Sequence, residues 1–141
     1  MSNAPQNALE IPIELRWSDQ DLLGHVNNAK LTTIAEEARI RSLGTLQEQA
    51  GYSGQLDVVL RTTHTDFLRP VHYESSIKVF VWVTRIGNTS CVMQHQLVQN
   101  GQVCVEVEAV MVMVDSAKQA PTPIPDEVRD ALETICAKPT E

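Results

Sequence analysis

Cysteine is scarce in this chain of 141 residues, and basic residues are fewer than acidic ones. The three cysteines form no C-x-x-C pair, so the sequence predicts neither a disulfide framework nor a metal site. We expect reduced thiols in a cytoplasmic protein. The net charge of -7 argues against a general nucleic-acid-binding surface and against a polybasic membrane surface. An anionic small ligand is still allowed, because it needs only a local cluster of bases.

Long hydrophobic runs are also lacking. No apolar stretch approaches the roughly 20 residues that cross a membrane, and the N-terminus does not show the basic-then-apolar pattern of a signal peptide. We therefore expect no membrane association. Apolar residues still make up 43% of the chain, enough for a core, and the length fits a single domain over residues 1–141.

The first third of the chain predicts one strand followed by one long helix. Apolar and polar residues alternate over residues 11–17, which is the period of a strand. From about residue 28 the period becomes helical, and the apolar stripe consists of Leu31, Ile34, Ala35, Ala38 and Ser42. Glu36, Glu37, Arg39 and Arg41 lie off this stripe, and the spacing of Glu37 and Arg41 favours an ion pair. 

The predicted helix spans about 17 residues, or roughly 25 Å. Gly44 is expected to mark its end and Gly51 the following loop. The rest of the chain reads mainly as strands, at residues 56–68, 77–84, 91–99 and 103–114. Asn100-Gly101 predicts a two-residue hairpin between the last two of them.

These elements predict an α+β domain with an antiparallel sheet, because consecutive strands are joined mostly by hairpins. Its core covers about residues 11–115, and a tail over residues 116–141 carries a short helix that starts at Pro125. One helix covers only one face of such a sheet and leaves its edges open. Edges of long apolar strands rarely stay unpaired, so we expect a dimer formed by joining two sheets edge to edge.

The junction between the first strand and the helix is crowded with polar groups, reading D-Q-D-L-L-G-H-V-N-N over residues 19–28. A helix start has unpaired N–H groups and a partial positive charge, which suit an oxyanion or a carbonyl becoming one. Asn27 or Asn28 is a natural N-cap, and Gly24 lets the loop turn tightly. Asp19 and Asp21 would share one side of an extended run.

The same residues are the parts of an acyl-transfer site. A carboxylate near an electrophilic carbonyl acts as a nucleophile or as a general base on water. His25 can hydrogen-bond, shuttle protons or orient a partner. An Asp-rich loop before a helix also arises from capping alone. Capping is the stronger interpretation for Asp19, whereas for Asp21 both interpretations stay open.

Four motifs occur in the order typical of one family. The motif R-W-S-D-Q-D-L-L-G-H-V-N-N, followed by E-E-A-R on the helix, resembles the opening of hotdog-fold acyl-CoA thioesterases of the 4-hydroxybenzoyl-CoA thioesterase-like group. Three later segments are similar to further motifs of that group: T-D-F-L-R-P-V, R-I-G-N-T-S-C and P-T-P-I-P-D-E-V-R. The resemblance covers about residues 11–135.

The resemblance implies a hotdog fold, in which a five-stranded antiparallel sheet wraps a long central helix and a short C-terminal helix follows. It implies a homodimer with two sites at the subunit interface, often paired again into a homotetramer. The implied activity is hydrolysis of a fatty or aromatic acyl-CoA thioester to free acid and CoA. No metal or cofactor takes part, and CoA belongs to the substrate.

The resemblance also assigns roles to residues of this chain. Asp21 matches the catalytic aspartate, the backbone N–H of Asn28 the oxyanion donor, and Glu36 the glutamate on the central helix. His25, Asn27 and Gly24 would hold the loop and the substrate. Candidate contacts to the CoA phosphates are Arg61, Arg69, Arg85 and Ser90. The chain departs from the usual family residues at Trp17, Asn28, Leu31 and Tyr73-Glu74, which bears on acyl specificity.

Two further functions fit the same fold. A non-catalytic module that binds acyl-CoA or an acyl carrier protein is one alternative, although the retained Asp21 favours an enzyme. A dehydratase is disfavoured because His25 follows Asp21 too closely for a D-x-x-x-x-H run, and a serine hydrolase is disfavoured because G-x-S-x-G is missing. We expect structural or exposed roles for the other histidines, and core positions for Cys91 and Cys104.

Overall fold

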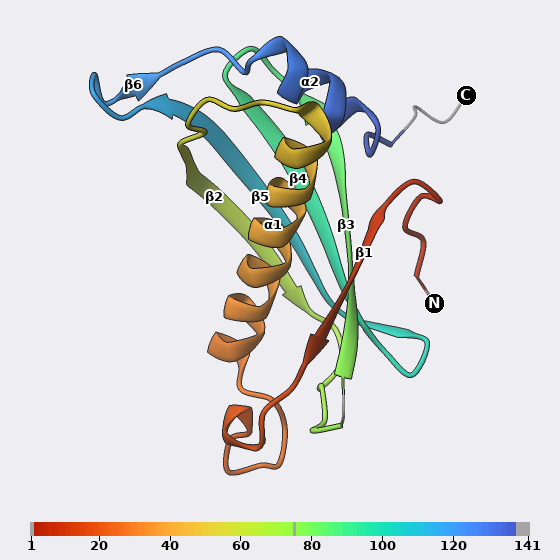
Figure 1. Cartoon of the computed structure of the whole chain (residues 1–141). Coiled ribbons are helices and arrows are strands. Elements are labelled where there is room, and N and C mark those ends of the chain that lie inside the picture. The colour runs from red at the N-terminus through yellow and green to blue at the C-terminus, as the bar shows by residue number, and fades with distance from the viewer. Residues whose placement is uncertain (1, 75, 138–141) are drawn as a thin grey trace.

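The computed structural model describes residues 2–74 and 76–137. A sheet curls around one long helix, α1, and a short helix, α2, lies at the C-terminal end of α1 (Figure 1). The elements are, in chain order, β1 (Leu9–Glu14), the 3₁₀ helix η1 (Trp17–Asp19), α1 (Asn28–Ala50), β2 (Val58–Phe67), β3 (Ser76–Ile86), β4 (Ser90–Gln99), β5 (Gln102–Asp115), β6 (Ala120–Pro121) and α2 (Asp126–Glu133). The predicted α+β architecture is confirmed.

Helix α1 is longer than predicted. It begins after Asn27, whose side-chain oxygen accepts a hydrogen bond from the Ala29 N–H at 2.8 Å, and it runs for 23 residues. Gly44 lies inside the helix, so the prediction that it marks the end is wrong. The helix ends instead at Gly51, which adopts a left-handed φ of 64°. Glycine reaches this conformation without steric cost, which makes it the usual helix terminator.

In the sheet the strands lie in the order β1-β3-β4-β5-β2, with antiparallel neighbours, and β6 adds to β5. The predicted hairpin at Asn100-Gly101 is confirmed. Both residues have positive φ, 53° and 74°, as a two-residue type I′ turn requires. Strands β2 and β3 do not form a hairpin, because β2 pairs with β5 at one edge and the chain then crosses to β3 near the other edge.

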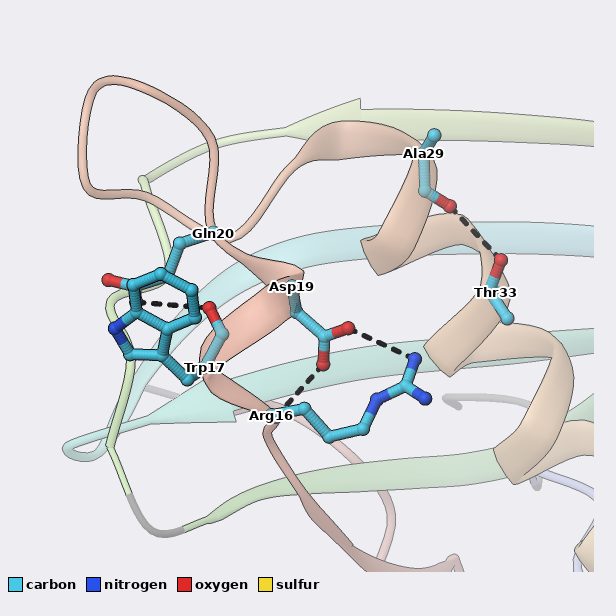
Figure 2. Close-up of polar contacts among 6 residues, drawn as sticks. All are labelled: Arg16, Trp17, Asp19, Gln20, Ala29 and Thr33. Atoms are coloured by element: carbon cyan, nitrogen blue, oxygen red, sulfur yellow. Dashed lines mark hydrogen bonds and ion pairs between the residues drawn. The ribbon is translucent and has the colours of Figure 1, made fainter.

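The first strand ends earlier than predicted, at Glu14, because residues 17–19 turn into η1. The Asp19 carboxylate closes this turn. It accepts hydrogen bonds from the Arg16 backbone N–H at 3.0 Å and from the Arg16 guanidinium at 3.1 Å (Figure 2). Asp19 is buried and Asp21 is exposed, so the two carboxylates do not share one side as an extended run would have placed them.

The core lies between α1 and the inner face of the sheet. All five residues of the predicted helical stripe are buried there, and Ala35 and Ala38 let the helix approach the strands closely. Cys91 and Cys104 are buried as expected, and burial raises the pKa of the Cys91 thiol to about 11. Among the described helices, none is long and apolar enough to span a membrane.

The sequence pattern placed Arg39 of α1 outside the buried face of the helix, and this prediction is wrong. Arg39 lies off the apolar stripe, yet only 4% of it is exposed. The sheet curls around α1, so the buried arc of the helix is wider than one stripe. The expected surface pair is confirmed, with Arg41 Nε donating to Glu37 Oε2 at 2.7 Å.

Candidate active site

The loop between η1 and α1 is a tight turn held by its own backbone. The Asp21 N–H donates to the His25 carbonyl at 2.8 Å, and the Gly24 N–H donates to the Asp21 carbonyl at 3.1 Å. Gly24 has a φ of +80°, a conformation that residues with a Cβ rarely adopt. Glycine at this position therefore lets the chain reverse within a few residues and brings Asp21 back towards the start of α1.

Asp21 is held in this turn by one carboxylate oxygen. Its Oδ1 accepts hydrogen bonds from the backbone N–H groups of Leu23 at 2.8 Å and of His25 at 3.3 Å. No donor from the described residues reaches Oδ2, and the residue is exposed. A carboxylate that is anchored at one oxygen and free at the other is suited to attack a carbonyl or to take a proton from water.

The first turn of α1 supplies the complementary charge. Asn27 acts as the N-cap, which leaves Asn28 as the first helical residue. Within residues 2–74 and 76–137, no acceptor pairs with the Asn28 backbone N–H. An unpaired amide at a helix N-terminus carries part of the positive end of the helix dipole and binds a developing oxyanion well.

Asp21 and Asn28 line the same cleft, which has a volume of about 280 Å³. His25 and Leu31 lie on the same wall, and the opposite wall is the end of β2 with the residues after it, Phe67, Leu68, Arg69, Pro70 and Val71. The fold thus brings Asp21 and the start of α1 to one cleft within a single chain. The second wall comes from a segment about 40 residues further along, which no local pattern connects to the loop.

A buried amide fixes the position of this second wall. Gln99 donates to the His72 carbonyl at 2.8 Å and accepts from the His72 N–H at 3.0 Å. The Val26 N–H donates to the Val71 carbonyl at 2.7 Å, and the rings of His25 and His72 pack edge to face with centroids 5.0 Å apart. Sequence reasoning missed Gln99, because nothing in its surroundings distinguishes it from other strand glutamines.

Asp19 supports the loop from outside the cleft. Its backbone carbonyl accepts a hydrogen bond from the Asn27 N–H at 2.9 Å, so η1 is tied directly to the N-cap of α1. Burial by itself raises the pKa of the Asp19 carboxyl, but the hydrogen bonds and the charge of Arg16 outweigh burial and lower that pKa below its ordinary value. The Asp19 carboxylate therefore has a capping role, but at η1 and not at the long helix that the sequence suggested (Figure 2).

The remaining predicted site residues are spread over the chain. Arg69 lines the cleft and donates from Nη1 to the Val103 carbonyl at 2.7 Å. Glu36 is exposed and lines a second, smaller cavity between α1 and β2. Arg61 occupies a bulge in β2, where the register with β5 shifts. Arg85 and Ser90 flank the β3–β4 turn, which Arg129 of α2 binds, at the far end of α1 from Asp21 (Figure 1).

Comparison with known proteins decides the family. The family model of the thioesterase-like superfamily matches residues 15–132. The chain belongs to the thioesterase-like superfamily. A predicted thioesterase from Bacillus stearothermophilus superimposes with a TM-score of 0.83 at 26% identity, covering 94% of this chain and 99% of that one. The fold is therefore the hotdog fold, and the protein is a thioester hydrolase.

Two further relatives of this thioesterase carry information on ligands. A thioesterase from Thermus thermophilus, solved with coenzyme A and Zn, has a TM-score of 0.78 at 26% identity and covers 95% of this chain and 97% of its own. The acyl-CoA thioesterase YbgC of Haemophilus influenzae is 23% identical over 132 residues, which is 92% of this chain and 97% of the relative. In this thioesterase no group of three or more described His, Cys, Asp or Glu side chains is arranged to hold a metal ion.

Proposed function

We propose that this thioesterase hydrolyses acyl-CoA thioesters at the cleft of Asp21, releasing a free acid and CoA. The observation that carries the proposal is that the free oxygen of Asp21 and the unpaired N–H of Asn28 belong to one cleft. The named activity of the Haemophilus influenzae relative and the coenzyme A bound to the Thermus thermophilus thioesterase support CoA as the thiol carrier.

The thioester carbonyl oxygen would accept a hydrogen bond from the Asn28 N–H. As the carbonyl carbon becomes tetrahedral, negative charge grows on this oxygen, and the helix N-terminus stabilises it more strongly than it stabilises the ground state. The charge on Arg69 lies on the opposite wall and adds to the positive potential of the cleft. The thiolate of CoA then departs and the carbonyl re-forms.

Asp21 has two possible tasks in this reaction. Its Oδ2 either attacks the thioester carbon and forms a mixed anhydride that water hydrolyses, or removes a proton from the water that attacks. Rapid-quench measurement of a single turnover separates the two routes. Free CoA thiol that forms ahead of the free acid marks the covalent route, and simultaneous formation marks attack by water.

We further propose that the working unit is a homodimer joined through β2, which can pair again into a homotetramer. The two edges of the sheet differ. β1 is six residues long and contains Pro12, which cannot donate to a neighbouring strand. β2 has ten residues, pairs with β5 alone among the described strands, and leaves Val59 and Phe67 about half exposed. Since Phe67 also lines the cleft, joining two β2 strands would place both sites next to the interface.

The proposed activity is tested by measuring release of free thiol from a panel of aliphatic, aromatic and carboxylated acyl-CoAs. We expect Asp21→Asn to lower turnover at least about a hundredfold, the scale of losing a positioned base or nucleophile. Asp130→Asn is the matched control, because Asp130 is an exposed carboxylate on α2. Near-normal turnover of Asp21→Asn, or no thiol release by the wild-type protein from any member of the panel, would overturn the proposal.

A further inference from the structure

A second cavity, of about 110 Å³, lies between α1 and β2. We call it the Arg39 cavity. Its lining includes Thr32, Glu36, Arg39, Leu60, Thr63 and Thr65. Apolar side chains, Ala35, Leu60 and Val107, line part of this space, and hydroxyl groups and a guanidinium line the rest. A purely aliphatic acyl chain would leave these polar groups without partners.

Arg39 is a buried cation with little compensation. Only 4% of the residue is exposed, and none of the described carboxylates forms an ion pair with it. Its Nη1 lies 3.5 Å from His95 Nε2, and its Nε is enclosed and has no hydrogen-bond partner within the described part of the chain. A buried guanidinium remains charged, and leaving it unpaired costs several kcal/mol.

His95 holds the guanidinium in place without neutralising it. The His95 ring is fully buried, and its Nδ1 lies 3.1 Å from the Val107 carbonyl, so Nδ1 carries the proton and Nε2 is free to accept from Arg39. Burial, together with the charge of Arg39, lowers the pKa of His95 to about 4, which keeps the ring neutral at pH 7. The positive charge of Arg39 therefore stays available to a ligand.

The lining residues place the Arg39 cavity beside the cleft of Asp21, further along α1 and β2. Leu31 lines the cleft, and Ala35 and Arg39, the next residues on that face of the helix, line the cavity. On the facing strand, Phe67 lines the cleft, and Thr65 and Thr63, at successive two-residue steps, line the cavity. A substrate whose thioester lies at Asn28 would extend its acyl group in the direction of Arg39.

This arrangement deepens the thioesterase function proposed above and rests on it. We propose that the Arg39 cavity binds the far end of the acyl group, and that this end carries a carboxylate that pairs with Arg39. A carboxylate supplies both the missing charge and two acceptors in the geometry of a guanidinium. The charge of Glu36 opposes it only weakly, because Glu36 is exposed to water and screened, whereas Arg39 is buried.

The proposal is tested first on the wild-type protein with chain-matched substrates. Succinyl-, adipyl- and suberyl-CoA are compared with butyryl-, hexanoyl- and octanoyl-CoA by free-thiol release, with ω-hydroxyhexanoyl-CoA as a neutral oxygen-bearing probe. We expect kcat/KM for the best carboxylated substrate to exceed that of its methyl-ended partner at least about tenfold, because the neutral chain leaves the buried cation unpaired.

Two variants then test whether Arg39 causes the preference for the carboxylated substrate. Arg39→Met keeps the length of the side chain and removes its charge, and it is expected to abolish the preference for the carboxylated substrate while turnover of its methyl-ended partner is kept or increased. Arg39→Lys is expected to keep part of the preference, since lysine retains the charge but lacks the two parallel N–H donors with which a guanidinium binds a carboxylate. The control is Arg41→Met, which removes an exposed arginine of the same helix and should leave the preference unchanged.

The urea midpoint of Arg39→Met distinguishes a ligand-binding role of Arg39 from a structural one, because only a structural role predicts that the midpoint falls. Replacing an unpaired buried charge by an apolar side chain is expected not to lower the urea midpoint. A lower midpoint for Arg39→Met with an equal loss of turnover on all substrates would assign Arg39 to folding and overturn the proposal. Equal or better turnover of methyl-ended or ω-hydroxy substrates by the wild-type protein would also overturn it, while leaving the thioesterase function intact. If no acyl-CoA at all is cleaved, the thioesterase proposal fails instead.

Discussion

The N–H of Leu23 donates to Asp21 Oδ1 at 2.8 Å, and this bond orients a carboxylate that lines the same cleft as the first turn of α1. The proposed oxyanion donor, the N–H of Asn28, is a backbone group, which side-chain substitutions do not remove. Proline does remove it, because it lacks a backbone N–H and is well tolerated at the first position of a helix.

Asn28→Pro is therefore expected to lower kcat about a hundredfold to a thousandfold, the scale of losing one oxyanion donor. The helix should still form, because Asn27 already has a φ of -63° and a ψ of 140°, the extended conformation preferred before proline. Asn28→Ala keeps the N–H and removes only the side chain, so it serves as the control. Equal activity of the two variants would show that the amide does not take part.

Asp19 makes a prediction about acid stability. Its pKa is lowered in the folded protein, so its contribution to stability is complete above the unfolded value of 3.8 and is lost as the pH falls through the lower folded value. Asp19→Asn is expected to lower the free energy of unfolding by roughly 1–3 kcal/mol at neutral pH. In urea titrations the wild-type and variant values should converge in strong acid. A difference that persists there would contradict the assigned role.

His95 predicts a pH dependence in a different range. Its pKa falls from 6.5 to about 4 on folding, so between these values the unfolded chain binds a proton that the folded protein excludes. Stability should therefore decrease as the pH drops from about 6.5 to about 4, by on the order of 3 kcal/mol.

The check is a pair of histidine variants measured in urea over this pH range. His95→Gln is expected to be less stable at neutral pH, because it disturbs the buried contacts to Arg39 and Val107, yet to show a flatter pH profile. His64→Gln removes an exposed histidine and should retain the wild-type profile. Parallel profiles for the wild type and His95→Gln would assign the pH dependence to other groups.

If two protomers join through the edge strand β2, a charged residue on that edge should dissociate the oligomer. We expect sedimentation velocity to show a dimer or a tetramer, with backbone amides of β2 that exchange more slowly with solvent as the protein concentration rises. Val59→Lys adds a charge to the half-exposed edge and is expected to shift the protein towards monomer. The control is Thr134→Lys, which adds the same charge at the exposed residue that caps the C-terminus of α2 and should leave the mass unchanged.

Several features of the fold were predicted correctly from short stretches of sequence. The N-cap was predicted at Asn27 or Asn28 and lies at Asn27. The tight turn at Gly24 and the hairpin at Asn100-Gly101 are found as expected, and each of these features depends on a few neighbouring residues. The errors arose where distant segments compete with a local pattern. Gly44 reads as a helix end, but packing of the following turns, with Leu46 buried, carries the helix on to Gly51.

The sequence alone identified the residues of the candidate catalytic loop, because Asp21, Gly24 and Asn28 lie within a few positions of one another. Only the tertiary structure decided what faces them. The wall from Phe67 to Val71 and the contact of Arg39 with His95 join segments far apart in the chain. Hydrophobic periodicity specifies that a face of a helix is buried, but it does not specify which segment covers that face. The burial of Arg39 and the cavity beside it depend on how the sheet packs around α1, so the sequence pattern did not predict them.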